Sequence, residues 1–170
     1  MSEKAIRRLR KRAGMTQARL ASVGGTSQPA IAAYEAGARS PNLNTLERLA
    51  RAADLDMVID FIPALTREDR RSLALHSAIA GKLRSDPGAV REQTRKTLRL
   101  MRQTHPNASA ILDRWAFLLD LHDEYLVEVL VDPRPLAREL RHATPFAGVL
   151  SAEERRRVYE LFAQHERETA

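Results

Sequence analysis

Hydrophobic residues recur at intervals of three and four along most of the chain, which is the period of amphipathic helices. In the first third of the sequence this pattern predicts four short helices, over residues 3–13, 17–23, 28–36 and 43–53. Glycine follows each of the first three helices, and Thr16 and Ser27 are good N-caps for the second and third. We therefore expect a small helical domain at the start of the chain.

One segment departs from the helical period. Residues Asp56 to Ile62 are rich in β-branched and aromatic side chains, alternate in part and end at Pro63, which predicts one short β-strand. Beyond it, helices are predicted over residues 66–83, 86–103, a segment containing Ile111 to Leu119, 123–131, 135–142 and 151–166. The fold class is therefore mainly α, with an N-terminal domain over residues 1–62 and a C-terminal helical domain over residues 66–170.

Composition narrows the class of protein further. The chain has 170 residues and no cysteine, which excludes disulfides, thiolate catalysis and cysteine-based metal sites. No apolar run reaches the roughly 18–20 residues that a membrane span needs. The N-terminus leads into basic residues without the apolar core of a signal peptide. We expect a cytoplasmic protein with no membrane partner.

The net charge of +6 is divided unevenly along the chain. Residues 1–62 carry +4, residues 63–105 carry +6 and residues 106–170 carry −4. This division indicates different partners for the two ends, although solvated helix faces would give the same sums. The densest basic cluster suits phosphate neutralisation and consists of Lys4, Arg7, Arg8, Arg10, Lys11 and Arg12.

The N-terminal helices carry a characteristic set of spaced residues. They are Thr16-Gln17-x-x-Leu20-Ala21, Ser27-Gln28-x-x-Ile31, Tyr34-Glu35-x-Gly37, Pro41 and Thr45-Leu46-x-x-Leu49-Ala50. Over residues 5–55 this spacing resembles the Cro/cI-type (XRE) helix-turn-helix family, whose domains have the lambda-repressor fold. The pattern agrees with that resemblance, because two short helices meet across a glycine turn and leave the start of the third helix exposed.

The resemblance implies that the helix beginning at Gln28 enters the major groove of operator DNA. A glutamine amide can pair with the N6 and N7 edge of adenine. The alanines of this helix offer only methyl groups, so we expect sparse base contacts and some reliance on DNA shape. Glu35 is more typical of a structural acid than of a base-reading residue. The predicted DNA-binding residues, including those placed for phosphate contacts, are Arg8, Gln17, Ser27, Gln28, Pro29, Ala32, Ala33 and Arg39.

Signatures of catalysis are missing from the sequence. The five histidines do not have metal-ligand spacing, and neither a phosphate-binding loop nor a nucleophile elbow occurs. Asp120, Asp123 and Glu124 form a local acidic cluster with too few converging oxygens for magnesium. We expect a protein that is not an enzyme and has no metal or cofactor.

The C-terminal half contains one irregular apolar stretch, residues 142–150. Either it lies across the core of its own domain or it docks on another protein, and the partner-binding hypothesis rests on Phe146, Val149 and Leu150. Trp115 is interpreted as a core residue. The net negative charge of residues 106–170 would attract a basic partner, such as an enzyme that acts on nucleic acid or nucleotides.

Two helix-turn-helix units usually bind DNA as a two-fold dimer. We expect a homodimer in which the predicted strands pair across the axis through Val58, Ile59 and Phe61. The overall architecture resembles the repressor-antitoxins of type II toxin–antitoxin operons. The predicted function is therefore an operator-binding repressor that also binds a toxin protein. The alternatives are a one-component regulator with a ligand-sensing helical domain, and a DNA-binding protein with a purely structural dimerisation domain.

Overall fold

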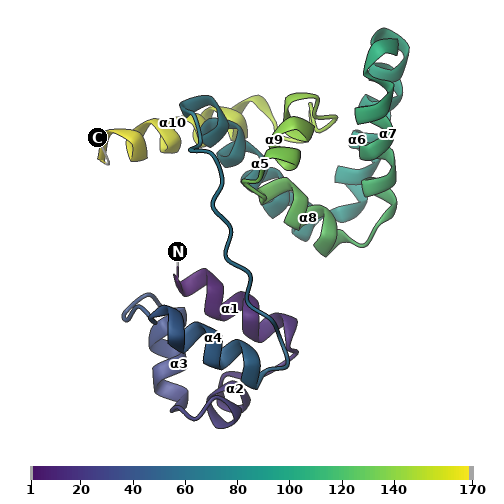
Figure 1. Ribbon diagram of the computed structural model, residues 1–170. Coiled ribbons are helices and arrows are strands. Elements are labelled where there is room, and N and C mark those ends of the chain that lie inside the picture. Colours follow the sequence, from purple (N-terminus) through teal and green to yellow (C-terminus); the bar gives the residue numbers. More distant parts are fainter. Residues whose placement is uncertain (1, 169–170) are drawn as a thin grey trace. The chain divides into compact units, whose positions relative to one another are not determined.

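The computed structural model describes residues 2–168, with side chains for residues 5–105 and 107–168. The chain divides into two compact units, residues 1–61 and 62–170, each with its own core (Figure 1). The domain division predicted after residue 62 falls beside this boundary. The two units are described separately.

The N-terminal unit consists of four short helices. They are α1 (Ser2–Arg12), α2 (Gln17–Val23), α3 (Gln28–Glu35) and α4 (Leu43–Ala52). The side chains of Thr16, Ser27 and Asn42 cap α2, α3 and α4 by accepting hydrogen bonds from backbone N–H groups in the first turn of each helix. Local capping residues therefore determine where these helices begin, as the sequence predicted.

Six buried apolar side chains form the core of this unit: Ile6, Leu20, Ala21, Ile31, Leu49 and Ala53. The turn between α2 and α3 lies close to this core at Gly24. A Cβ atom at Gly24 would lie 2.3 Å from a methyl carbon of Leu49 and 2.9 Å from the carbonyl oxygen of Leu20. Gly25 follows with φ +59, a backbone conformation that favours glycine. The two glycines thus set the angle at which α3 leaves α2.

The predicted β-strand is wrong. No strand occurs in residues 2–168, and residues 55–66 have no regular secondary structure. Val58, Ile59 and Phe61 are 87%, 53% and 94% exposed. The β-branched composition favours an extended backbone, but a strand also needs a hydrogen-bonding neighbour, and residues 55–66 have none among the described residues. The single chain therefore has no strand here, and pairing of this segment with its copy across a two-fold axis stays a prediction.

The C-terminal unit is entirely helical in its regular structure. Its elements are α5 (Arg67–Ser85), α6 (Pro87–Thr104), the 3₁₀ turn η1 (Pro106–Ala108), α7 (Ser109–Asp120), α8 (Asp123–Val131), α9 (Pro135–His142) and α10 (Ala152–Glu168). A capping box at Thr66 and Asp69 starts α5, as predicted. Helix α5 packs on α6, α8, α9 and α10 and is therefore the central helix of the unit.

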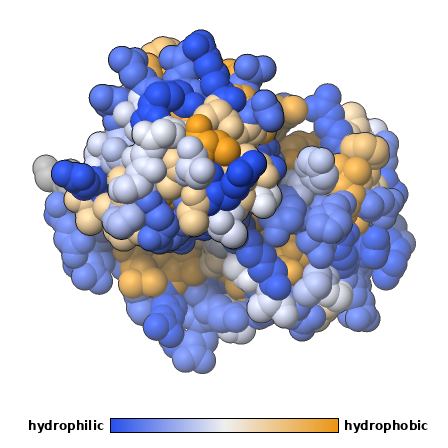
Figure 2. All heavy atoms as spheres, turned by 90° about the horizontal axis from the view of Figure 1, so that it is seen from below, coloured by the Kyte–Doolittle hydropathy of each residue, from blue (hydrophilic) through white to orange (hydrophobic). Residues whose placement is uncertain are grey.

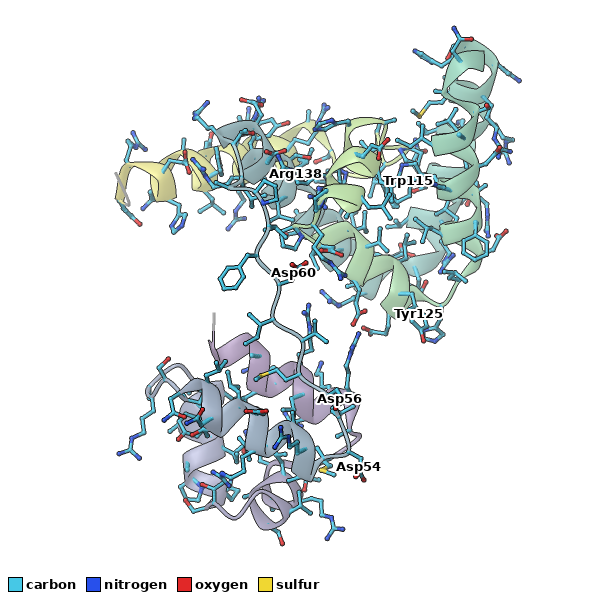
Figure 3. The ribbon with its side chains drawn as sticks, in the orientation of Figure 1. Asp54, Asp56, Asp60, Trp115, Tyr125 and Arg138 are labelled. Carbon is cyan, nitrogen blue, oxygen red and sulfur yellow. The ribbon has the colours of Figure 1, made fainter. Side chains whose placement is uncertain are left out.

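Trp115 lies in the centre of the core of this unit and is fully buried, as predicted (Figure 3). Its indole Nε1 donates a hydrogen bond to the carbonyl oxygen of Leu140 at 3.0 Å. The ring of Phe146 meets the indole edge-on, with 5.3 Å between ring centroids. This aromatic pair joins α7 to the segment that follows α9.

The irregular apolar stretch belongs to the core, and this corrects the partner-binding hypothesis. Phe146, Val149 and Leu150 are 2%, 6% and 6% exposed and pack among the core side chains of the unit. The carbonyl oxygen of Ala147 accepts hydrogen bonds from the side chains of α6. Because these three apolar side chains already fill the interior of their own unit, they are not available to a partner.

Arginines of α6 are paired with carboxylates of the next two helices. Arg91 contacts Asp123 and also donates to carbonyl oxygens at the end of α7. Further pairs join Arg95 to Asp120, Arg102 to Asp113, Lys82 to Glu154 and Arg70 to Glu166. The acidic segment 106–170 (−4) is therefore paired in part with the basic segment 63–105 (+6) within one unit, which leaves +2. The predicted attraction of a basic partner to an acidic end loses its support.

A buried polar network lies between α5 and α9. Asp69 accepts hydrogen bonds from Thr66 and from Arg138, which is labelled in Figure 3. The ring of His76 lies 2.8 Å from the carbonyl oxygen of Ser72 and 2.9 Å from the hydroxyl oxygen of Thr144. Burial lowers the pKa of His76 to about 4, with a smaller contribution from the nearby charge of Arg141. This histidine is therefore neutral at physiological pH.

Candidate nucleic-acid interface

A chain of hydrogen bonds connects α1, α2 and α3 to the exposed start of α3. The Arg10 guanidinium holds the Glu35 carboxylate with two bonds, Nε to Oε1 at 2.7 Å and Nη2 to Oε2 at 3.1 Å. The Gln17 amide nitrogen donates to Glu35 Oε2 at 3.0 Å. The Gln17 amide oxygen then accepts from Gln28 Nε2, also at 3.0 Å. We call these four side chains the glutamine relay.

The inner end of the relay is a buried charge. Glu35 is 6% exposed, and the Arg10 hydrogen bonds hold its carboxyl pKa below the ordinary value. The same contact raises the pKa of Arg10. Both groups are therefore charged at neutral pH, and the bidentate geometry restricts how the carboxylate can turn. Glu35 is thus a structural acid, as expected.

The outer end of the relay is Gln28, which is exposed at the first position of α3. Because Gln17 uses its amide nitrogen on Glu35 and its amide oxygen on Gln28, it fixes which way the Gln28 amide faces. Gln17 was predicted as a phosphate contact, and the structure gives it this positioning role in addition. A side-chain amide whose position and orientation are both fixed is suited to bidentate pairing with one base edge.

The other predicted residues of α3 lie along the same helix. Ser27 is the N-cap, and its hydroxyl oxygen accepts from the backbone N–H of Ala30 at 3.3 Å. Pro29 is exposed at the first turn, and Ala32 and Ala33 are half-buried one turn further on. The side chains of Ala32 and Ala33 are themselves single methyl groups, which can contact only the methyl group of thymine.

Arg39 lies in the exposed loop after α3. Its backbone N–H donates to the carbonyl oxygen of Ala33 at 3.3 Å, which holds this loop against the end of the helix. Its side chain is exposed. A long flexible cation at this position is suited to a phosphate contact.

Arg8 does not join this group of residues. It lines a separate hollow between α1 and α4, together with residues that follow α4. Other members of the basic cluster are used within the fold, since Arg7 donates to the backbone carbonyl of Glu35 and Arg10 to its carboxylate. The Lys4 side chain lies outside the described residues. Only part of the basic cluster is therefore available for phosphates.

Sequence reasoning missed the role of Arg10 as the residue that holds the relay. It was grouped with its basic neighbours as a phosphate contact. The carboxylate that it binds lies 25 positions away on another helix, so no local pattern could have paired the two. The sequence indicated only that Glu35 is more typical of a structural acid, without showing which cation it pairs with.

Two features of other functional classes do not occur among the described residues. No group of three or more histidine, aspartate or glutamate side chains is placed to hold a metal ion within residues 5–105 and 107–168. Nor does any helix among the described residues have the length and apolar character to cross a membrane.

The comparison with protein families agrees with this geometry. A family model described as helix-turn-helix matches residues 6–58. The match covers the N-terminal unit and supports the Cro/cI-type (XRE) helix-turn-helix family for this domain. The presence of this domain in turn supports the interpretation that the protein is a DNA-binding transcription regulator. No curated protein and no solved structure matches the chain.

Proposed function

We propose that the protein is a transcriptional repressor that binds a specific operator sequence and has no catalytic activity. The observation that carries this proposal is the glutamine relay, which fixes the amide of Gln28 at the exposed start of α3. A protein that bound DNA through charge alone would not need an oriented amide at this position, because phosphate contacts carry no sequence information.

Recognition combines one oriented base contact with phosphate contacts around it. Gln28 reads an adenine, and the N-terminal ends of α2 and α3 and Arg39 hold the sugar–phosphate backbone. Since Ala32 and Ala33 read little, the remaining specificity comes from the shape and deformability of the operator.

Titration of operator and scrambled duplexes tests this proposal. Gln28→Ala is expected to cost roughly 1–3 kcal/mol on the operator and to relax discrimination at one base pair. Arg39→Ala is the matched control, since the loss of a phosphate contact weakens all duplexes alike and reduces the salt dependence. Equal losses on both duplexes for Gln28→Ala would contradict base reading.

The repressor acts as a homodimer in this proposal. One helix-turn-helix unit covers only a few base pairs, and two units on a two-fold axis read half-sites about one DNA turn apart. The exposed apolar side chains Val58, Ile59 and Phe61 support self-association through this segment, without strand pairing.

A second candidate function is that of an antitoxin, whose C-terminal unit would bind a toxin protein. The observation that favours it is an open apolar groove of about 660 Å³ beside α7 and α9. Phe117 and Leu136 line this groove and are 65% and 55% exposed. The face shown in Figure 2 is largely hydrophilic, with hydrophobic side chains gathered in patches. A groove of this size also fits a small ligand, which is the sensor alternative.

Co-expression of the full chain with the protein encoded beside it distinguishes the two candidates. An antitoxin retains that protein, and Phe117→Ser releases it while operator binding is unchanged. A small ligand that lowers operator affinity, without any retained protein, would instead identify a sensor.

A further inference from the structure

The segment that leaves α4 combines exposed apolar side chains with free backbone groups. Val58 and Phe61 are 87% and 94% exposed, and Ile59 between them is 53% exposed. Within the described chain, residues 56–65 form no backbone–backbone hydrogen bond. Large apolar side chains gathered at neighbouring exposed positions are typical of an interaction site. We call residues 58–61 the apolar segment.

A groove on the same unit has the matching character. It has a volume of about 250 Å³, and Ala5, Leu9, Leu46 and Ala50 provide apolar lining from α1 and α4. Arg8 and Arg12 of α1 also line it, together with one carboxylate, Asp56, so the two guanidinium groups outnumber the acid. We call this hollow the α1/α4 groove. It offers an apolar surface beside guanidinium groups, whereas the apolar segment carries a carboxylate, Asp60, between two apolar side chains (Figure 3).

The two surfaces carry opposite charges, Arg8 in the α1/α4 groove and Asp60 in the apolar segment, and neither is paired within the described chain. Arg8 and Asp60 form no hydrogen bond or ion pair with any described residue. In its own chain only the first residue of the segment, Val58, lines this groove, and Ile59, Asp60 and Phe61 lie outside the lining. Phe61 therefore remains exposed.

We propose that the apolar segment of one chain docks in the α1/α4 groove of a second copy, and that the second copy returns the same contact. Asp60 then pairs with Arg8 of the other chain, and Val58 and Phe61 are removed from water. The contact is isologous, so each interaction occurs twice in the dimer. The inference rests on the proposed function in that it supplies the dimer that a two-fold operator requires.

Substitution of the aromatic anchor tests the apolar part of the contact. Phe61→Ser in the full chain is expected to weaken dimerisation roughly 30-fold or more, the effect of losing an interface anchor. Leu43→Ser is the matched control, because Leu43 is also exposed on the same unit but lies outside the groove and the segment. Sedimentation equilibrium without DNA measures both. Equal dimerisation of Phe61→Ser and the wild-type chain would overturn the proposal.

Charge exchange tests the predicted pairing of Arg8 with Asp60. Arg8→Glu and Asp60→Arg are each expected to weaken the dimer, and the double variant is expected to restore it, because each chain then offers the exchanged pair. Lys11→Glu, an equal charge reversal on the same helix outside the groove, should leave the dimer intact. Failure of the double variant to recover would contradict this pairing.

Cross-linking locates the contact, since the chain has no cysteine of its own. A mixture of an Ala5→Cys chain and an Ile59→Cys chain is expected to form a disulfide between different chains. A mixture of Ala5→Cys with Leu43→Cys is expected to form none. Equal cross-linking in both mixtures would overturn the docking mode.

Operator titration of the same variants separates this inference from the proposed function. In one outcome, the wild-type chain binds the operator specifically and yet remains a monomer, both in solution and on DNA. That result would overturn the docking and leave base recognition in place. A wild-type dimer that cross-links as expected but does not distinguish operator from scrambled DNA would support the docking and contradict the repressor.

Discussion

In the N-terminal unit, the Arg10 guanidinium binds the buried carboxylate of Glu35. That carboxylate accepts a hydrogen bond from Gln17, which in turn accepts one from the exposed Gln28. In the C-terminal unit, three of the four arginines of α6 pair with carboxylates of α7 and α8, and these pairs connect helices of the same unit. The same residue type thus prepares a surface for recognition in one unit and joins helices in the other. Net charge along a sequence therefore does not show which segment meets DNA.

The largest expected effect concerns the core of the C-terminal unit. Phe146→Ala should lower the free energy of unfolding of this unit by about 3–5 kcal/mol, because it removes the ring that packs on Trp115 and leaves a cavity. Trp115 is the one tryptophan of the chain, so its fluorescence during urea unfolding reports this unit alone. A Phe146→Ala chain of unchanged stability would mean that the ring is not a core element.

The corresponding test in the N-terminal unit is the inner end of the relay. Glu35→Gln should lower the stability of this unit by about 1.5–3 kcal/mol, since Arg10 loses its charged partner. Hydrogen exchange of the α2 and α3 amides measures the loss, while the Trp115 transition should not move. Glu47→Gln, which breaks an exposed pair with Arg51, is the control and should cost about 0.5 kcal/mol or less. Similar losses for both variants would contradict a special role for the buried pair.

Acidification should lower the stability of the C-terminal unit and leave that of the N-terminal unit unchanged. The folded-state pKa of His76 is about 4, below its ordinary value of 6.5, so the folded state disfavours the protonated ring. The stability that the neutral ring contributes is fully present above pH 6.5 and is lost as the pH falls toward 4. Between pH 7 and pH 5 the C-terminal unit should lose about 2 kcal/mol.

The N-terminal unit should be insensitive over that interval, because all five histidines lie beyond residue 75 and the lowered pKa of Glu35 acts only at lower pH. Urea unfolding followed at Trp115 at several pH values gives the measurement. His76→Gln should flatten the profile; a wild-type profile that is already flat between pH 7 and pH 5 would contradict the assignment.

The smallest expected effect concerns two exposed ion pairs of α6. It tests whether these pairs keep the arginines from binding DNA phosphates. Asp113→Asn with Asp120→Asn frees Arg102 and Arg95 from exposed ion pairs, at a cost of about 1 kcal/mol or less in stability. Non-specific DNA binding at low salt should strengthen and become more salt-dependent, since two cations become available for phosphates. Unchanged binding to scrambled DNA would show that pairing was not what kept α6 away from DNA.

Local signals explain which parts of the fold were predictable. The helix starts at Thr16, Ser27 and Thr66 follow from capping residues that act within one turn, and the structure has them where the sequence predicted. The helix-turn-helix resemblance over residues 5–55 is likewise supported by the match over residues 6–58.

Non-local contacts explain the rest. The segment from Asp56 to Ile62 has strand-forming residues, but a strand depends on a neighbour that no local pattern reveals. The Arg10–Glu35 pair joins two helices across 25 positions. For Phe146 the sequence showed an apolar residue in an irregular stretch, and only the packing against Trp115 distinguishes a core position from a docking surface.

The ten residues 56–65, without backbone–backbone hydrogen bonds, also act as a tether. Fully extended, they reach at most about 33–36 Å, which is close to one turn of DNA. The start of the C-terminal unit therefore stays within about that distance of the N-terminal unit, and whatever each unit binds is held at the raised effective concentration of a linked molecule. Lengthening this tether would lower that concentration without altering a single contact in either unit.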